Sequence, residues 1–362
     1  MKRAGFFVAT AAIALFASPS AHAEPATPNV TLTVTPGTAG GPWKLVVNNA
    51  GELPVLIAAD PRTLTLDLIP QNPSAKVTTL RCTLPDDARP TTDEGRELVV
   101  PAKRSWSASF DPLFYCFGAK ERALLVPGTT VKAQLGWPTP LVAPKNTKKA
   151  PAAPSAPFVV SPVGASVGQL APMKALEAST FTLSEAVTAA PPPASAAAAS
   201  PAPSDSESTP PKQALSISAT EATDVARGVD VPITLTLANE SDRAVTTFFR
   251  ASTIAFTVNG PAGSVSCGSP RAIAEPFREL FATIGVKGKT QSNLLISSLC
   301  PAGTFDDPGI YRIVSKLDTR GTSGRNVGLK TWDGEVAAKT PALIRVRTPR
   351  KTTPPAKKPQ LD

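Results

Sequence analysis

The segments WKLVVNNAGELPV (residues 43–55) and ITLTLANESDRAV (residues 233–245) follow the same pattern, and their alignment continues without a gap to Leu68 and Val258. In both segments apolar residues recur at every second position, as in a β-strand with one buried face. Each pattern then passes through a turn rich in Asn, Gly, Ser and Asp. A repeat of this kind predicts that the chain contains two copies of one β-rich module.

Further short strands with the same period of two surround this repeat. They are separated by turns that contain Pro and Gly, and no segment has a sustained helical period. We therefore predict an all-β fold of two tandem antiparallel immunoglobulin-like β-sandwiches, joined by a Pro/Ala/Ser-rich disordered linker. Besides the repeat, strands are expected at 29–36, 97–101, 105–110, 130–135, 176–183, 280–286, 290–296, 311–317 and 342–347.

Composition divides the chain into parts of different character. A Pro- and Ala-rich linker of this kind predicts that the two modules move largely independently. The basic, Pro/Lys-rich end has little to bury and predicts disorder. The expected parts are a signal peptide (1–23), a first sandwich (24–186) with a disordered insertion at about 139–157, a disordered linker (187–212), a second sandwich (213–348) and a disordered tail (349–362).

The first residues have the features of a cleaved bacterial secretory signal. Lys2 and Arg3 precede an apolar stretch at 6–17, and AHA at 21–23 is a small-x-small cleavage site. No Cys stands near the cleavage site to carry a lipid, and no other stretch is apolar over the length of a membrane span. We expect a periplasmic or secreted protein with no transmembrane segment in the mature chain.

Export changes the interpretation of the four Cys residues, because disulfides form in oxidising compartments. The repeat selects the pairs Cys82–Cys116 and Cys267–Cys300, since each module then closes by itself. Closing a loop of such length removes about 4 kcal/mol of denatured-state entropy. A redox or metal site is the weaker alternative, because neither pair has CxxC spacing and no His partner exists.

The lack of histidine limits the chemistry of the mature chain. The only His is His22, inside the signal segment. Ser-His-Asp and Cys-His catalysis, His acid–base chemistry and nearly all catalytic zinc or iron sites therefore lack a necessary group. We expect a non-enzymatic protein without a cofactor or metal ion. Carboxylate-only and Ser-Lys mechanisms are the remaining alternatives.

The net charge of +9 is not concentrated on the modules. A nucleic-acid partner would need a basic face with interleaved aromatic residues on a folded domain, so we expect none. The tail is expected either to contact anionic envelope polymers electrostatically or to serve as a solubilising end. Its charged residues are Arg350, Lys351, Lys357, Lys358 and Asp362.

Three motifs of the second copy carry a resemblance: LTLANESDRAV (235–245), IAFTV (254–258) and PGIY (308–311). They resemble bacterial extracytoplasmic immunoglobulin-like domains, and more narrowly the BsuPI-type intracellular proteinase-inhibitor domain, which pairs an Asn-x-Ser-Asp-x-x-Val turn with a later Pro-Gly-x-Tyr. The first copy is similar, but it has Thr130 where this pattern has Tyr. The resemblance implies the sandwich fold and, as one possible activity, protease inhibition. The Cys pairs are not part of that family's pattern.

Several local groups are candidate sites. Acidic residues could bind Ca²⁺, but their spacing is not that of a calcium loop, so solvated loop charge is favoured; an acid/base pair is a weaker alternative. A Ser-Lys arrangement at 74–76 lies in a stretch typical of an exposed loop. Trp43 is expected in the core, whereas Trp137 and Trp332 at strand ends are candidates for glycan contact. The acidic residues are Asp86, Asp87, Asp93, Glu94, Asp306 and Asp307.

Taken together, these patterns favour an exported, non-enzymatic interaction or envelope-associated protein with an unknown protein or cell-envelope partner. Two linked modules suit binding, since a linker converts weak contacts into avidity. The alternative is a secreted or periplasmic protease inhibitor, which presents an extended loop to a protease. The loops 85–101 and 269–279 are the candidates for that role. The unequal divergence of the copies favours the second module as the binding one.

Overall fold

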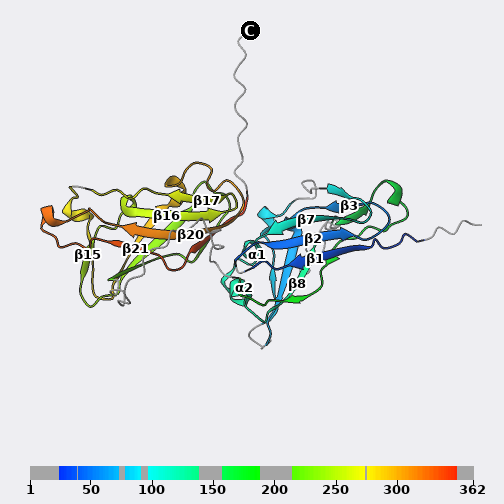
Figure 1. Cartoon of the computed structure of the whole chain (residues 1–362), viewed down its shortest axis with the longest axis horizontal. Coiled ribbons are helices and arrows are strands. Elements are labelled where there is room, and N and C mark those ends of the chain that lie inside the picture. Colours follow the sequence, from blue (N-terminus) through cyan, green and yellow to red (C-terminus); the bar gives the residue numbers. More distant parts are fainter. Residues whose placement is uncertain are drawn as a thin grey trace, which may run out of the picture.

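The computed structural model describes residues 24–38, 40–72, 78–90, 97–137, 157–187, 214–273 and 275–348. These residues form an all-β structure of antiparallel sheets, arranged as two sandwiches (Figure 1). The predicted signal peptide and tail, most of the linker and of the insertion, residues 74–76 and residues 93–94 lie outside the described residues.

Two packed sheets and a smaller third one make up the first module. The first sheet has the order β1-β2-β7, the second β10-β8-β4-β5 with β11 also paired to β8, and the third β6-β3-β9. The last expected strand, 176–183, is divided into two short pieces. The strands are β1 (Val30–Thr35), β2 (Trp43–Asn49), β3 (Val55–Ala58), β4 (Leu64–Ile69), β5 (Leu80–Cys82), β6 (Glu97–Val100), β7 (Arg104–Phe110), β8 (Thr130–Leu135), β9 (Val160–Pro162), β10 (Leu176–Glu177) and β11 (Phe181–Thr182).

The second module repeats this order. Its sheets are β12-β14-β19, β13-β22-β20-β16-β17 with β21 paired to β20, and β15-β18. All pairs are antiparallel except β13 with β22. The strands are β12 (Leu215–Ala219), β13 (Ala222–Val225), β14 (Pro232–Asn239), β15 (Val245–Thr247), β16 (Ile254–Gly260), β17 (Gly263–Cys267), β18 (Ala282–Ile284), β19 (Lys289–Leu295), β20 (Gly309–Asp318), β21 (Glu335–Ala337) and β22 (Ala342–Val346).

This strand order is that of an immunoglobulin domain. The sheet β12-β14-β19 corresponds to strands A, B and E, and β22-β20-β16-β17 to G, F, C and C′. Tyr311 at the start of β20 adds a further feature of such domains, because its hydroxyl donates to the carbonyl of Asp307 at 2.7 Å. The predicted immunoglobulin-like sandwich fold is therefore confirmed.

The repeated Asn is buried in both modules and binds the same kind of partners. The Nδ2 atom of Asn49 donates to the carbonyls of Leu53, Val100 and Pro101, at 2.9, 3.1 and 3.1 Å. Nδ2 of Asn239 donates to the carbonyls of Arg243, Ile284 and Gly285, at 2.7, 3.1 and 2.9 Å. Each amide thus ties the turn after strand B to the strand that precedes strand E.

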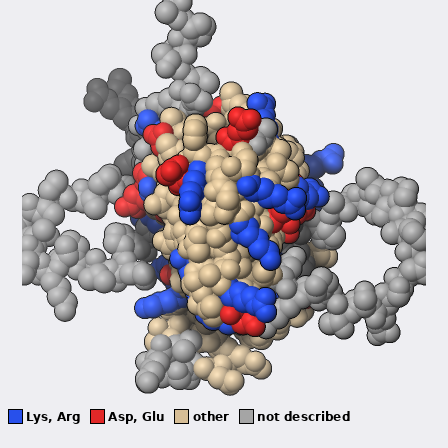
Figure 2. Space-filling model, turned by 90° about the vertical axis from the view of Figure 1, so that its left-hand side faces the viewer, with Lys and Arg blue, Asp and Glu red and all other residues tan. Residues whose placement is uncertain are grey.

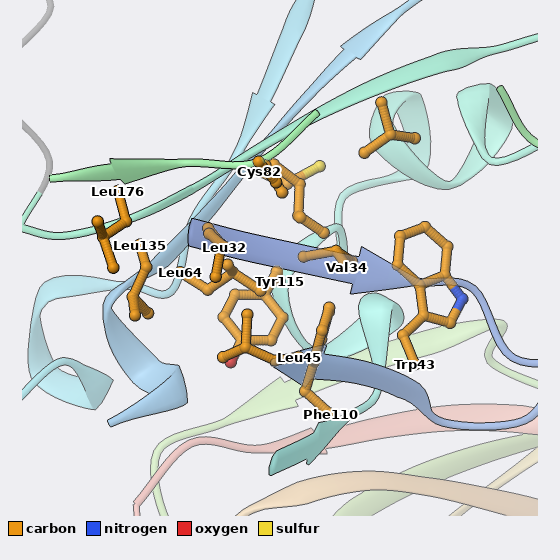
Figure 3. Close-up of a cluster of buried hydrophobic side chains, with 14 of the residues drawn as sticks. Leu32, Val34, Trp43, Leu45, Leu64, Cys82, Phe110, Tyr115, Leu135 and Leu176 are labelled. Carbon is orange, nitrogen blue, oxygen red and sulfur yellow. The ribbon is translucent and has the colours of Figure 1, made fainter. Parts of the chain in front are cut away.

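Apolar residues of alternating register fill the space between the sheets. In the first module Trp43, predicted to be core, is only 1% exposed. Its ring lies edge-on to Phe110, with the centroids 5.9 Å apart, and Tyr115 packs edge-on to Phe110 at 5.5 Å. Figure 3 shows these rings beside Leu45 in the same cluster.

Both disulfides expected from the repeat are present, Cys82–Cys116 and Cys267–Cys300. In each module the first Cys ends strand C′, β5 or β17, and the second lies in the connection between strands E and F. The expected strands did not include β5, β9, β12, β13, β17 or β21. Most of these are short, and β17 contains Gly and Ser, whereas β12 does alternate and was overlooked. The first module's connection contains two short helices, α1 (Pro112–Tyr115) and α2 (Ala119–Leu124).

Candidate interaction sites

The outer face of the second module's larger sheet packs against the first module. All five residues of β22 are buried, although only alternate residues of a strand can face its own core. Leu343 and Arg345 lie on the outer face, opposite Arg312 and Ile310 of β20. Ile310 and Leu343 join the apolar cluster of the first module. In Figure 1, α1 and α2 lie on the side of the first module that faces this sheet.

Arg345 has several partners at this junction. Its Nε and Nη2 atoms donate to the two carboxylate oxygens of Asp224 at 3.0 and 2.5 Å, and Nη1 donates to the Phe114 carbonyl of the first module at 3.2 Å. The guanidinium also lies 4.6 Å from the centre of the Phe117 ring. Because the side chain is only 9% exposed, these contacts are poorly screened by water.

Arg312 forms the most buried ion pair between the modules. Its guanidinium, 8% exposed, donates to one carboxylate oxygen of Asp111 at 2.8 Å. The other oxygen of Asp111 caps α1 by accepting from the Leu113 amide. One carboxylate therefore starts the helix and binds the neighbouring module. Two more pairs cross the junction, Arg347 with Asp87 at 2.6 Å and Arg122 with Glu221 at 2.8 Å.

A disulfide holds the helix that makes these contacts. Cys116 ends α1, its bond to Cys82 ties α1 to β5, and Phe117 follows immediately. The prediction that the modules move independently is wrong for the described residues, because buried arginines and apolar side chains join them. The prediction relied on linker composition alone, which carries no information about contacts between the modules.

A groove of about 1350 Å³ opens beside the junction. All five residues of β12 line one part of it, and another part is formed by the segment from Val336 to Pro341 with Leu343. The first module contributes Leu113 and Arg122, and Val187 at the start of the linker also lines the groove. The groove is therefore bounded on one side by a sheet edge of the second module and elsewhere by residues from both modules.

The far end of the second module carries the loop 269–279, which the sequence singled out. Within it, Phe277 is 74% exposed, more than any other large apolar side chain among the described residues. The loop is held by hydrogen bonds: the Arg271 amide donates to the Ser252 carbonyl at 3.0 Å, and the Ile273 amide donates to Thr322 Oγ1 at 3.1 Å. Phe277 thus projects from an anchored loop rather than from a chain end.

Aromatic and charged residues surround this loop. Phe281 packs edge-on against the buried Phe248, with the ring centroids 5.4 Å apart, and the Arg250 Nε donates to the Leu280 carbonyl at 3.2 Å. Nearby, hydrogen bonds from Arg320 hold the pKa of the Asp318 carboxyl below its usual range. Figure 2 looks onto this end, where Lys and Arg side chains are spread over the surface with Asp and Glu among them.

The other loop that the sequence offered for protease binding is less accessible. In 85–101, Ala88 and Pro90 are buried and Asp87 is paired with Arg347 of the second module. The stretch 91–96 lies outside the described residues. The junction therefore uses part of this loop as an internal contact.

The tryptophans proposed for glycan contact are only half-buried, and both pack on the cores. Trp137 lies against the first core and its Nε1 donates to the Pro90 carbonyl at 3.4 Å, while Trp332 lies against the second core. Their rings are therefore partly used in packing.

The acidic clusters do not converge on one point. The Asp86 side chain is 97% exposed and pairs with Arg89. No group of three or more His, Cys, Asp or Glu residues that could hold a metal ion occurs within the described ranges. In the same part of the chain, no helix is long and apolar enough to cross a membrane.

Sequence reasoning missed the junction arginines. Arg312, Arg345 and Arg347 alternate with apolar residues, as they would on a solvent-exposed sheet face. A usable signal lay in the partner segment instead: LFYCF at 113–117 is apolar, whereas SSLCP at 297–301, which corresponds to it by the position of the Cys, contains two serines. Phe277 likewise lies in a loop that was singled out only as a whole.

No known protein family matches the chain, and no curated protein matches it in sequence. Among solved structures, the chain is similar to the red sea bream transglutaminase at 12% identity and a TM-score of 0.19, covering 87% of this chain and 31% of that one. It is also similar to the CARDB domain of a Pyrococcus furiosus protein at 9% identity and a TM-score of 0.18, covering 37% of this chain and 95% of that domain. The chain spans under a third of the length of the transglutaminase. Neither likeness carries an argument about function.

Proposed function

We propose that this chain is an exported, non-enzymatic binding protein whose distal loop, 269–279, contacts a protein partner. The observation that carries the proposal is Phe277, 74% exposed on a loop that hydrogen bonds hold in place. Burying a Phe side chain in a partner contributes about 2–3 kcal/mol. An anchored loop also loses little conformational entropy on binding.

Several observations support export and the absence of catalysis. Two disulfides are typical of an oxidising compartment. The expected mature chain has no His, and no three or more Asp or Glu residues gather as a metal-binding group within the described residues. The envelope is the expected place of action, and the tail is a second contact for anionic polymers there.

The test compares the intact chain with Phe277→Ala on fractionated envelope and secreted proteins. Wild type is expected to retain one or a few specific proteins that the variant loses, with a drop in affinity of roughly tenfold or more. Leu295→Ala is the matched control, because Leu295 is also exposed, at 48%, but lies outside the loop. If wild type, Phe277→Ala and Leu295→Ala all retained the same proteins to the same extent, the role of the loop would be refuted.

Protease inhibition is the second candidate, and the same residue favours it. An exposed Phe on an anchored loop could enter the S1 site of a chymotrypsin-like protease. In that case substoichiometric titration of such proteases shows tight inhibition by wild type and none by Phe277→Ala. No loss of activity at a large excess of intact protein removes this candidate and leaves the binding role in place.

A further inference from the structure

The register of β12 leaves one edge of its backbone unpaired. The Thr220 amide donates to the Thr234 carbonyl, and the Glu240 amide donates to the Ala214 carbonyl. In an antiparallel pair, opposite residues alternate between exchanging two hydrogen bonds and exchanging none. The amides and carbonyls of Ser216 and Ser218 therefore face β14, whereas those of Leu215, Ile217 and Ala219 face the other way.

Within the described residues, no strand ladder pairs with that second edge, although β21 lies near it. β12 is the terminal strand of the order β12-β14-β19, and all five of its residues line the 1350 Å³ groove. The equivalent strand of the first module is treated differently: Leu32 of β1 forms a parallel bridge to Ala178, which partly closes the same edge. An open strand edge is normally covered or blunted, since it is a template for pairing.

We propose that the free edge of β12 accepts an extended peptide segment of a partner protein, which adds a strand to the β12-β14-β19 sheet inside the groove. Backbone hydrogen bonds to Leu215, Ile217 and Ala219 supply affinity, and pockets for alternate side chains supply selectivity. This site is separate from the distal loop and does not depend on it.

The lining of the groove indicates what such a peptide contains. Pro341 is the half-buried apolar residue of the opposite wall, whereas Val336 and Leu343 lie behind it with their side chains in the cores. Two carboxylates line the groove, but Glu221 pairs with Arg122 and Glu240 accepts from the Ser216 hydroxyl. Lys339 also lines it, is exposed, and has no carboxylate partner among the described contacts. The favoured peptide therefore carries an apolar residue that packs on Pro341 and an acidic residue near Lys339.

A single extended chain suits this site better than a second folded copy. The edge is bounded by the segment 336–341 and by residues of the first module, including Arg122. A partner sheet would bring several strands and their side chains against those walls, whereas one strand needs only the usual spacing of about 4.8 Å from β12. The linker of this same chain is the competing occupant, because Val187, at its start, and Leu215, just after its end, both line the groove.

The test uses peptides selected from a random display library on the immobilised, full mature chain. Selected peptides are expected to bind in solution and to protect the amides of Leu215, Ile217 and Ala219 from hydrogen exchange. Ala219→Pro removes one of these donors without touching the bonds to β14, so affinity falls about tenfold. Lys339→Glu reduces the affinity of the acidic peptides in particular.

Gln291→Pro is the matched control. Gln291 lies on β19, opposite Thr236, so its amide faces the free edge on the other side of the sheet. It is expected to leave peptide affinity unchanged, and circular dichroism confirms that each variant folds. Peptides that bind wild type and Ala219→Pro equally, or a library that yields no binder, would overturn the proposal.

A second variant tests the competing occupant. In it, residues 191–211 are replaced by Gly and Ser at the same length. If the amides of Leu215, Ile217 and Ala219 are protected in the free wild-type chain and lose protection in this variant, the linker fills the groove and the proposal is wrong. Rapid exchange in both free chains, followed by protection on adding peptide, supports it.

Discussion

In the first module the connection between strands E and F forms α1 and α2 and packs against its neighbour, whereas in the second module it is a short 3-10 turn followed by exposed residues 301–303. Both connections contain the second Cys of a disulfide to strand C′. The cross-link therefore occupies the same place in each copy, but only one copy uses it to support an interface. The difference lies in the residues around the Cys, LFYCF at 113–117 against SSLCP at 297–301.

The turn after strand B shows the opposite behaviour, since it is nearly the same in both copies. Besides the buried Asn amides, Lys103 donates to the Ala50 carbonyl at 2.8 Å and Lys287 to the Glu240 carbonyl at 2.6 Å. Both lysines have a positive φ, 58° and 54°. Matching backbone strain at matching places indicates that the turn is a shared structural anchor.

The largest expected effect concerns that anchor. Asn49→Ala and Asn239→Ala each remove the three hydrogen bonds that Nδ2 donates, together with those that Oδ1 accepts from Gly51 or Ser241, and leave buried carbonyls without a donor. Each substitution therefore lowers the free energy of unfolding by about 3–5 kcal/mol. Urea unfolding, with hydrogen exchange read separately for each module, measures both losses. Asn48→Ala is the control, because Asn48 is next to Asn49 in the sequence but its side chain makes no hydrogen bond among those described. We expect it to change the free energy of unfolding by no more than about 0.5 kcal/mol. A loss confined to one of the two buried positions would contradict the equivalence of the anchors.

The second prediction concerns the junction, which only the first module's connection between strands E and F supports. Arg345→Ala removes the hydrogen bond to the Phe114 carbonyl and the contact with Phe117, and leaves Asp224 without its main partner. The lost contacts with Phe114 and Phe117 weaken the coupling between the modules, whereas the lost pair with Asp224 lowers the stability of the second module itself. We expect a total loss of about 2–3 kcal/mol. Small-angle scattering should then show a larger radius of gyration, and unfolding should separate into two transitions.

Arg320→Ala is the matched control for that experiment. Arg320 is also an arginine paired with carboxylates, Asp318 and Glu335, but it is 62% exposed and lies at the distal end. Its removal is expected to leave the radius of gyration and the coupling unchanged, since exposed ion pairs contribute little. Equal effects of the two substitutions would mean that Arg345 acts through general charge rather than through the junction.

The same contrast explains what the sequence could predict. The repeat, the Cys spacing and the period of two depend on local pattern, and they led correctly to the sandwich fold, the buried Trp43 and both disulfides. The burial of Arg312 and Arg345 depends on a partner surface far along the chain. A strand covered on both faces normally has a continuous apolar sequence. Here arginines that pair with carboxylates or carbonyls at the junction interrupt that run, so the sequence resembles a strand with one exposed face.

The candidate sites were predictable to a smaller extent. The loop 269–279 was identified because it is polar and bounded by strands, but only the structure shows that its one large aromatic side chain, Phe277, is strongly exposed. The free edge of β12 could not be predicted, since the strand itself was not. Edge position follows from which strands pair, and LSISA at 215–219 has the same alternation as a central strand.

The smallest predicted effect compares the two tyrosines, one in each module. The Tyr311 hydroxyl donates to the Asp307 carbonyl and that of Tyr115 to the Pro61 carbonyl, at 2.7 and 2.8 Å. Burial raises the pKa of both phenols above the usual value of about 10. Below pH 10 the phenols are neutral in both the folded and the unfolded chain, and their contribution to stability is fully present. Above pH 10 that contribution is lost progressively, because the phenols ionise in the unfolded chain while the raised pKa keeps them neutral in the folded one.

Tyrosinate absorbance during an alkaline titration checks this directly. These are the only two Tyr residues, so Tyr311→Phe and Tyr115→Phe each leave a single reporter. In both variants the signal is expected to appear together with the loss of circular dichroism, rather than at the pH of a free phenol. Each substitution itself costs about 1 kcal/mol, through the lost hydroxyl bond. If one tyrosine ionised near pH 10 while the chain stayed folded, its hydroxyl would be accessible to water in the folded state. The two modules would then differ at their tyrosines as well as at their E–F connections.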